Sequence, residues 1–76
     1  MEKTKDTDTE IKFRERFNEC LHYARVRQTD LAHAANVSKQ CISDYKSGKS
    51  MPSIDTLFRI CKYLDVSADY LLGLED

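Results

Sequence analysis

The feature that most limits the fold of this chain is a set of apolar residues that recur three or four positions apart. From Ile11 onward, this spacing places such residues on one side of a helix. The members of the first stripe are Phe13, Phe17, Cys20, Leu21 and Ala24. The chain has two glycines and one proline, and no segment alternates between apolar and polar residues as a strand would. The sequence therefore predicts an all-α fold whose first helix covers residues 10–25.

Four shorter helices are predicted after the first one, separated by residues that favour helix ends. They span residues 28–35, 39–46, 54–64 and 68–72. Ser38, Ser53 and Ser67 can each cap the start of a helix, because a serine side chain accepts from the free amides of the first turn. Asn36 and Gly48 tolerate the left-handed backbone that ends a helix. We expect the fourth helix to bury an apolar stripe made of Ile54, Leu57, Phe58, Cys61 and Leu64.

These helices predict a compact five-helix bundle over residues 10–74. Residues 1–9 are polar after Met1 and are expected to form a disordered tail, with residues 75–76 as the C-terminal end. A chain of 76 residues has room for one domain. The sequence contains neither a stretch long enough to span a membrane nor the apolar core of a secretory signal, so we expect a cytoplasmic location and no membrane partner.

The three cysteines, Cys20, Cys41 and Cys61, do not form a Cys-x-x-Cys pair. We expect them to be small apolar thiols in or near the core of a protein from a reducing compartment. A zinc site needs more ligands at closer spacing, and the only histidines are His22 and His33. The sequence therefore predicts no metal and no cofactor, and it offers no evident small-molecule site.

The net charge of −1 conceals an uneven distribution along the chain. Residues 1–10 hold two lysines against four acids, and residues 50–76 hold two basic residues against five acids. Residues 11–49 hold eight basic residues against four acids. Positive charge is thus confined to the first half of the predicted bundle, which suits an anionic partner such as nucleic acid. The alternative, a merely solvated charged surface, is left open by charge alone.

Two short helices joined by a tight turn, at 28–35 and 39–46, form the arrangement that reads the major groove of DNA. The second helix must present polar side chains that reach base edges and must bury its opposite side. Lys39, Gln40, Ser43 and Asp44 share the outer face at helical spacing. Ile42 and Tyr45 fall on the inner face.

The chain resembles the phage-repressor-like helix-turn-helix family of the Cro/CI, XRE type over about residues 11–73. The residues that carry the resemblance are Gln28-Thr29-Asp30-Leu31-Ala32, Asn36-Val37-Ser38, Ile42-Ser43, Tyr45, Gly48-Lys49, Pro52-Ser53, Leu57, Asp65-Val66-Ser67 and Asp69-Tyr70-Leu71-Leu72-Gly73. The resemblance implies a lambda-repressor-like domain that acts as a sequence-specific transcriptional regulator, in particular a repressor. It also implies double-stranded DNA as partner, bound by a homodimer.

Individual roles follow from the resemblance, position by position. The residues expected to read bases are Lys39, Gln40 and Asp44, with Ser43 at their margin. The residues expected to contact phosphate are Arg27, Gln28, Lys46, Ser47, Lys49 and Ser50. Gln28 is also expected to brace the recognition helix. Asp44 has three open interpretations: it accepts from cytosine N4, it orients Gln40 four residues earlier, or it is an ordinary surface acid.

The chain departs from the family pattern at three places. Arg27 stands where a threonine or serine usually precedes the glutamine, and Asn36 replaces the usual turn glycine. Leu21 and Lys46 stand where the family often pairs an arginine with a glutamate. We hypothesise that an apolar contact replaces this pair and frees Lys46 for phosphate.

Two other classes of function were weighed. An enzyme that uses Cys20 or Cys41 with His22 or His33 is not expected, because so small a bundle rarely encloses a substrate. A protein–protein interaction module of the same fold, without its own DNA specificity, is the stronger alternative, since the second half of the chain is acidic.

The last helix is the expected dimer surface. Its candidate residues are Tyr70, Leu71 and Leu74, which carry apolar side chains near the end of the chain. The alternative is that these residues close the core.

Overall fold

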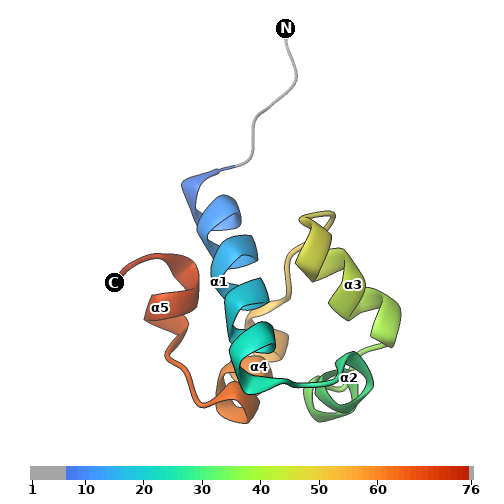
Figure 1. Cartoon of the computed structure of the whole chain (residues 1–76). Helices are drawn as coiled ribbons and strands as arrows, with labels where there is room; N and C mark the ends of the chain where they lie inside the picture. The colour runs from blue at the N-terminus through green and yellow to red at the C-terminus, as the bar shows by residue number, and fades with distance from the viewer. Residues whose placement is uncertain (1–6, 76) are drawn as a thin grey trace, which may run out of the picture.

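The computed structural model describes residues 7–75, which form five helices and contain no strand. The helices are α1 (Asp8–Ala24), α2 (Gln28–Ala35), α3 (Lys39–Ser47), α4 (Ile54–Leu64) and α5 (Ala68–Leu72). α5 and α3 flank α1 on opposite sides, while α2 packs against both α3 and α4 (Figure 1). The predicted all-α, compact five-helix architecture is confirmed.

The first helix begins two residues earlier than predicted, because Thr7 caps it. The Thr7 hydroxyl accepts from the Glu10 amide at 3.1 Å, and the Glu10 carboxylate accepts from the Thr7 amide at 2.9 Å. This reciprocal pair satisfies two amides at the helix start. Asp8 and Thr9 are therefore helical, and the expected tail over residues 1–9 is wrong at its last residues. Residues 1–6 of that tail, like Asp76, lie outside the described residues.

Each helix ends in the left-handed backbone conformation, as far as the described chain extends. The predicted cases, Asn36 (φ 61°) and Gly48 (φ 85°), are confirmed. Arg25 and Asp65 adopt the same conformation; aspartate, like asparagine, tolerates it, whereas arginine does so at a steric cost. The predicted serine caps of α3, α4 and α5 are also present, each accepting from the amide three residues later. Of the successive helices in the described chain, α2 packs against α3 and α4 against α5, whereas the other close pairs join helices farther apart along the chain.

The core lies where α1, α2 and α3 meet, with one deeply buried residue from each of the last two helices. Its members are Phe13, Phe17, Leu21, Leu31, Ala32, Ala35, Ile42, Tyr45, Ile60 and Leu71. The rings of Phe13 and Phe17 stack with centroids 5.1 Å apart, and Tyr45 meets Phe17 edge-on at 6.4 Å. The small side chains of Ala32 and Ala35 allow α2 to approach its neighbours closely. From the first predicted stripe, Cys20 is half-buried and Ala24 is exposed.

The predicted apolar stripe of α4 is wrong at two of its five members. Ile54 is 88% exposed and Phe58 is 59% exposed, whereas Thr56 and Ile60 are buried. Residues four apart share a side of a helix, so Thr56 and Ile60 mark the core side, and Ile54 and Phe58 mark another. Leu57, Cys61 and Leu64 are half-buried between these two sides. The apolar arc of α4 is therefore wider than the surface that the other helices cover.

The expected dimer surface on the last helix is also wrong in part. Leu71 is fully buried, so it belongs to the core of the single chain. Tyr70 is half-buried. Its side chain is already engaged within the chain: the ring lies 4.4 Å from the Arg16 guanidinium, and the hydroxyl donates to Glu19 at 3.3 Å. Leu74 alone is strongly exposed, at 74%. The alternative interpretation, closure of the core, holds for Leu71.

No described helix combines the length and the hydropathy that a membrane crossing requires.

Cys20, Cys41 and Cys61 are free thiols and half-buried, which agrees with the expectation that they lie near the core.

The exposure pattern of α4 predicts unequal costs for two similar substitutions. Ile60→Ala should lower the free energy of unfolding by about 2–5 kcal/mol, because it leaves a cavity in the core. Ile54→Ala, at the exposed position of the same helix, should change it by about 0.5 kcal/mol or less. Urea unfolding of dilute protein measures both. Equal losses for the two variants would contradict the orientation of α4.

Candidate nucleic-acid interface

The outward face of α3 is set by the residues on its inward face. Ile42 is fully buried and Tyr45 is 6% exposed, so both anchor α3 to the core. Lys39 and Gln40 are consequently exposed on the opposite side, and Ser43 and Asp44 are half-buried at its edges. The predicted base-reading residues therefore share one accessible face of α3.

Gln40 is held by Asp44 one turn later on this face. The Gln40 Nε2 group donates to the Asp44 Oδ1 atom at 3.0 Å. Because an ionised carboxylate only accepts, this bond turns the amide nitrogen of Gln40 toward Asp44. The amide oxygen and the second N–H of Gln40 remain for other partners. Of the three interpretations of Asp44, orientation of Gln40 is the one with a contact in the free protein.

Gln28, the first residue of α2, connects the two helices of the motif through both ends of its amide. Its Nε2 group donates to the Ser43 Oγ atom at 2.9 Å, and its Oε1 atom accepts from Lys46 Nζ at 3.0 Å. The two contacts lie three residues apart along α3, so they restrain its rotation about its own axis. The bracing role expected of Gln28 thus has a physical basis. The hydroxyl of Ser43 is thus already bound to Gln28, on the side of α3 that faces α2.

The hypothesis about Leu21 and Lys46 is correct in one part and wrong in the other. Leu21 is 7% exposed, so an apolar residue does fill the position of the family's arginine. Lys46 is not released from all partners, because its ammonium group donates to Gln28. It retains further N–H groups, since an ammonium carries three donors. Lys46 therefore ties α3 to Gln28 of α2 and still presents positive charge beside that residue.

The segment after α3 uses its backbone amides to close the end of that helix. The amides of Lys49 and Ser50 donate to the Asp44 carbonyl at 2.9 and 3.4 Å, and the Gly48 amide donates to Tyr45. These amides close the C-terminus of α3 and are therefore occupied. The Ser47 hydroxyl likewise donates to the Asp44 carbonyl at 3.2 Å. The side chains of Ser47, Lys49 and Ser50 are exposed, so the phosphate contacts expected of these residues stay a prediction that their side chains can meet.

Arg27 lies at the N-cap of α2 and makes no side-chain cap. Its Nε atom lies 3.6 Å from the Asp30 carboxylate, with the arginine side chain 83% exposed. An ion pair this open to solvent contributes little stability. The replacement of the family's usual threonine or serine by Arg27 therefore leaves α2 without a side-chain cap and places a cation at its start, next to Gln28.

Asn18 of α1 is a functional candidate that the sequence analysis missed. Its Nδ2 group donates to the Lys46 carbonyl at 3.0 Å and to the Arg14 carbonyl at 2.8 Å. It thereby ties the C-terminal turn of α3 to α1. Together with Gln28, Ser43, Lys46 and Ser47 it lines a shallow polar recess between the three helices. The sequence did contain a sign of this role: Asn18 is a polar residue between the core positions Phe17 and Leu21, on the side of α1 that faces α3.

Arg14 was missed for a similar reason. A Cβ atom added at Gly48 would lie within 3.1 Å of the Arg14 Cδ atom, so this side chain passes directly over the end of α3. It brings a cation from α1 to the segment that precedes Lys49. Its sequence neighbours do not reveal this, because the contact joins residues more than thirty positions apart.

The thiol chemistry weighed as an alternative is not favoured by the environment of Cys20. Burial raises the pKa of the Cys20 thiol above its ordinary value, and the neighbouring Glu19 carboxylate raises it further. A nucleophilic cysteine requires the opposite shift, since the thiolate is the reactive form. The ring of His22 lies edge-on to Tyr23, with centroids 5.7 Å apart.

Comparison with known proteins identifies the motif. A helix-turn-helix family model matches residues 24–71, which include all of α2, α3 and α4. The chain is 32% identical over 60 residues to YqaE, an uncharacterized HTH-type transcriptional regulator of Bacillus subtilis (strain 168). The match covers 79% of this chain and 52% of YqaE, so the chain spans about half the length of that relative. No solved structure matches the chain.

The link between α1 and α3 predicts a measurable effect of Asn18. Asn18→Ala should destabilise the domain by about 1–2 kcal/mol, because it removes two hydrogen bonds and leaves carbonyls less well satisfied. Thermal unfolding of the variant measures this loss. Glu15→Ala, at an exposed position of the same helix, serves as the matched control and should change stability by about 0.5 kcal/mol or less. Equal effects of the two variants would argue against the link.

Proposed function

This chain belongs to the XRE-type helix-turn-helix family, and on that premise we propose that it is a sequence-specific, double-stranded DNA-binding transcriptional regulator that acts as a repressor. The observation that carries the proposal is the outward face of α3, where Gln40 is oriented by Asp44 and the helix is braced by Gln28. A surface organised in this way before binding loses little side-chain entropy on docking. Action on bacterial or phage DNA would place the chain in the cytoplasm.

Gln40 is the proposed centre of base recognition. A glutamine pairs with adenine by accepting from N6 and donating to N7. The bond to Asp44 uses one N–H of Gln40 and leaves the oxygen and the second N–H for this pair. Lys39, exposed one residue before, is proposed to donate to guanine O6 or N7, or to a phosphate. Ser43 lies at the margin, already held by Gln28.

Phosphate contacts are proposed to supply most of the affinity, because Asp44 introduces a negative charge into the groove. The proposed cations, Arg27, Lys46 and Lys49, come from the start of α2, the last turn of α3 and the segment after it. Gln28, Ser47 and Ser50 are proposed to add uncharged donors around them. These groups surround the face of α3, as expected for contacts that position a helix in the major groove.

Repression is proposed to follow from occupancy, since a domain bound across a promoter excludes polymerase without further chemistry. Readers of this kind bind two half-sites as a dimer whose spacing matches a helical turn of DNA. We therefore propose a homodimer on DNA. Its interface does not include Leu71, because that side chain is fully buried in the single chain.

A second candidate function is a protein-interaction module of the same fold. The exposed apolar side chains of α4 and the acidic second half of the chain favour it. The two functions differ in their response to salt, because phosphate contacts release counterions from DNA.

A gel-shift series at increasing salt tests the DNA-binding proposal. Three phosphate-neutralising cations per chain, or six in the proposed dimer, predict that the logarithm of the dimer's binding constant falls by roughly 5 per tenfold rise in salt. Lys49→Ala removes one cation from each chain, so it should reduce this slope by about 2 and weaken binding to every DNA sequence alike. Absence of DNA binding at low salt would overturn the proposal and favour the interaction module.

Selection of binding sites from random oligonucleotides tests the readout. Asp44→Ala should relax the preference at one base pair, a loss of about 1–3 kcal/mol of discrimination, because Gln40 is no longer oriented. Gln40→Ala should relax the same position. If Asp44→Ala selects the wild-type sequence with unchanged preference, Asp44 has no part in recognition.

A further inference from the structure

We propose that the exposed side of α4 is the surface on which a second copy of this chain docks, with the two α4 helices antiparallel. This surface, here called the α4 face, is centred on Ile54 and Phe58. The inference builds on the proposed homodimer and assigns its interface, but it does not require DNA. It replaces the surface expected on the last helix, of which Leu71 is buried.

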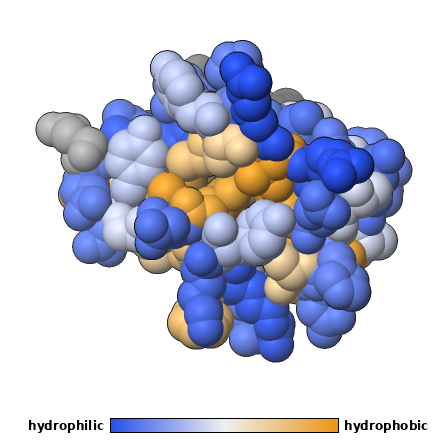
Figure 2. All heavy atoms as spheres, turned by 60° about the horizontal axis from the view of Figure 1, so that its bottom comes forward, coloured by the Kyte–Doolittle hydropathy of each residue, from blue (hydrophilic) through white to orange (hydrophobic). Residues whose placement is uncertain are grey.

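The α4 face is a contiguous apolar surface. An isolated exposed leucine or phenylalanine is common on a soluble protein, whereas a continuous apolar patch indicates an interaction site. Ile54 and Phe58 border a groove whose other lining residues are Leu57, Cys61, Lys62, Asp65, Val66 and Ala68. An apolar band framed by hydrophilic side chains is visible on the side of the molecule where the end of α4 comes forward (Figure 2).

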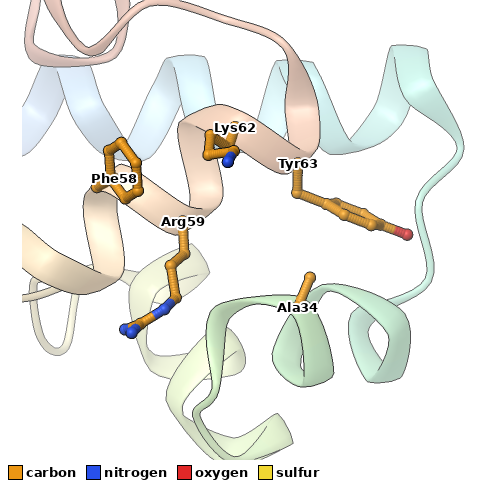
Figure 3. A pocket seen from close by; sticks show the side chains of 5 residues that line it. All are labelled: Ala34, Phe58, Arg59, Lys62 and Tyr63. Carbon is orange, nitrogen blue, oxygen red and sulfur yellow. The ribbon is translucent and has the colours of Figure 1, made fainter.

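A second recess continues the α4 face toward α2. Phe58 and Lys62 line both hollows, and Arg59, Tyr63 and Ala34 complete the second one. Arg59 and Tyr63 project from α4 in opposite directions on either side of Ala34 of α2, and Phe58 lies farther along α4 (Figure 3). Tyr63 is 46% exposed, so it adds a further aromatic side chain to the rim. The apolar surface thus covers the length of α4 from its first residue nearly to its last.

The shape of the α4 face is complementary to itself. In an antiparallel pair with its two-fold axis beside Phe58, position 54 of one copy lies opposite position 62 of the other. The strongly exposed Ile54 side chain then meets the far end of the partner's groove, which is lined by Cys61, Asp65 and Val66. The same contact occurs twice, as a two-fold interface requires. One face therefore supplies both the protruding side chain and the hollow that receives it.

The charges of the α4 face are complementary in the same arrangement. Asp55 lies near the start of α4 and Lys62 near its end, on the same side of the face. Antiparallel pairing brings Asp55 of each copy toward Lys62 of the other. Within one chain, Lys62 lies 5.6 Å from the centre of the Phe58 ring, and Asp55 is paired with Arg59. A parallel arrangement would instead set Asp55 level with Asp55 and Lys62 level with Lys62, so opposite charges would not meet, and the antiparallel orientation is favoured.

The α4 face leaves the proposed DNA-reading surface accessible. Within residues 7–75, α4 contacts α1, α2 and α5 but has no set of contacts with α3. A partner on α4 therefore need not cover Lys39 or Gln40. Dimer formation and DNA binding use different surfaces, and they can be measured separately.

Sedimentation equilibrium of the full chain without DNA, over a wide concentration range, tests the inference. The wild type should associate reversibly to a dimer. Ile54→Asp with Phe58→Asp should weaken association by about tenfold or more, because charges replace the apolar contacts of both copies. Both positions are exposed in the single chain, so its unfolding should be unaffected, as circular dichroism will verify. Leu74→Asp, at an exposed leucine outside the α4 face, should leave association unchanged.

A charge exchange tests the antiparallel orientation. Asp55→Lys and Lys62→Asp should each weaken the dimer, since each places like charges opposite one another. The variant with both changes should restore association, because the pairs re-form with reversed signs. Failure of this restoration would overturn the antiparallel arrangement.

The outcomes separate the interface from the proposed function. A wild type that remains monomeric at every concentration, or loss of the dimer in Leu74→Asp alone, overturns the α4 interface. A monomer that still shifts DNA leaves the proposed function standing. A dimer that binds no DNA at low salt contradicts the function and supports the interface.

Discussion

The burial of Ile42 and Tyr45 is the constraint on which the rest of the site depends. These two side chains attach α3 to a core built largely from α1 and α2, with Tyr45 edge-on to Phe17. Once they are buried, the opposite side of the helix has to face solvent, and Lys39 and Gln40 lie there. A recognition helix needs this fixed orientation, because a rotation of one residue about its axis would replace its reading face with another.

Polar contacts refine what the apolar core sets. Gln28 reaches Ser43 and Lys46, and Asn18 reaches the carbonyl of Lys46 from α1. α3 is therefore restrained from both neighbouring helices. On its outer face, the bond between Gln40 and Asp44 orients a side chain before any partner arrives. Within the free protein, the contact of Asp44 is therefore with a neighbouring polar side chain of the same helix face.

The two halves of the domain present different surfaces to solvent. The half formed by α2 and α3 presents polar and basic side chains, whereas α4 presents Ile54 and Phe58. Since α2 separates α4 from α3, binding on one surface does not obstruct the other. This separation would allow a domain of 76 residues to accommodate both the proposed nucleic-acid surface and the proposed docking surface.

The sequence by itself determined the helices, their capping serines, the turn at Asn36 and which residues of α3 face outward, because these depend on residues a few positions apart. It did not reveal the capping by Thr7, although that signal is also local. Only the tertiary structure decided that Ile60 rather than Phe58 enters the core, that Leu71 is buried, and that Lys46 binds Gln28. Periodicity shows that a helix has an apolar side. How much of that side is covered depends on the surface that the other helices offer, which no local pattern records.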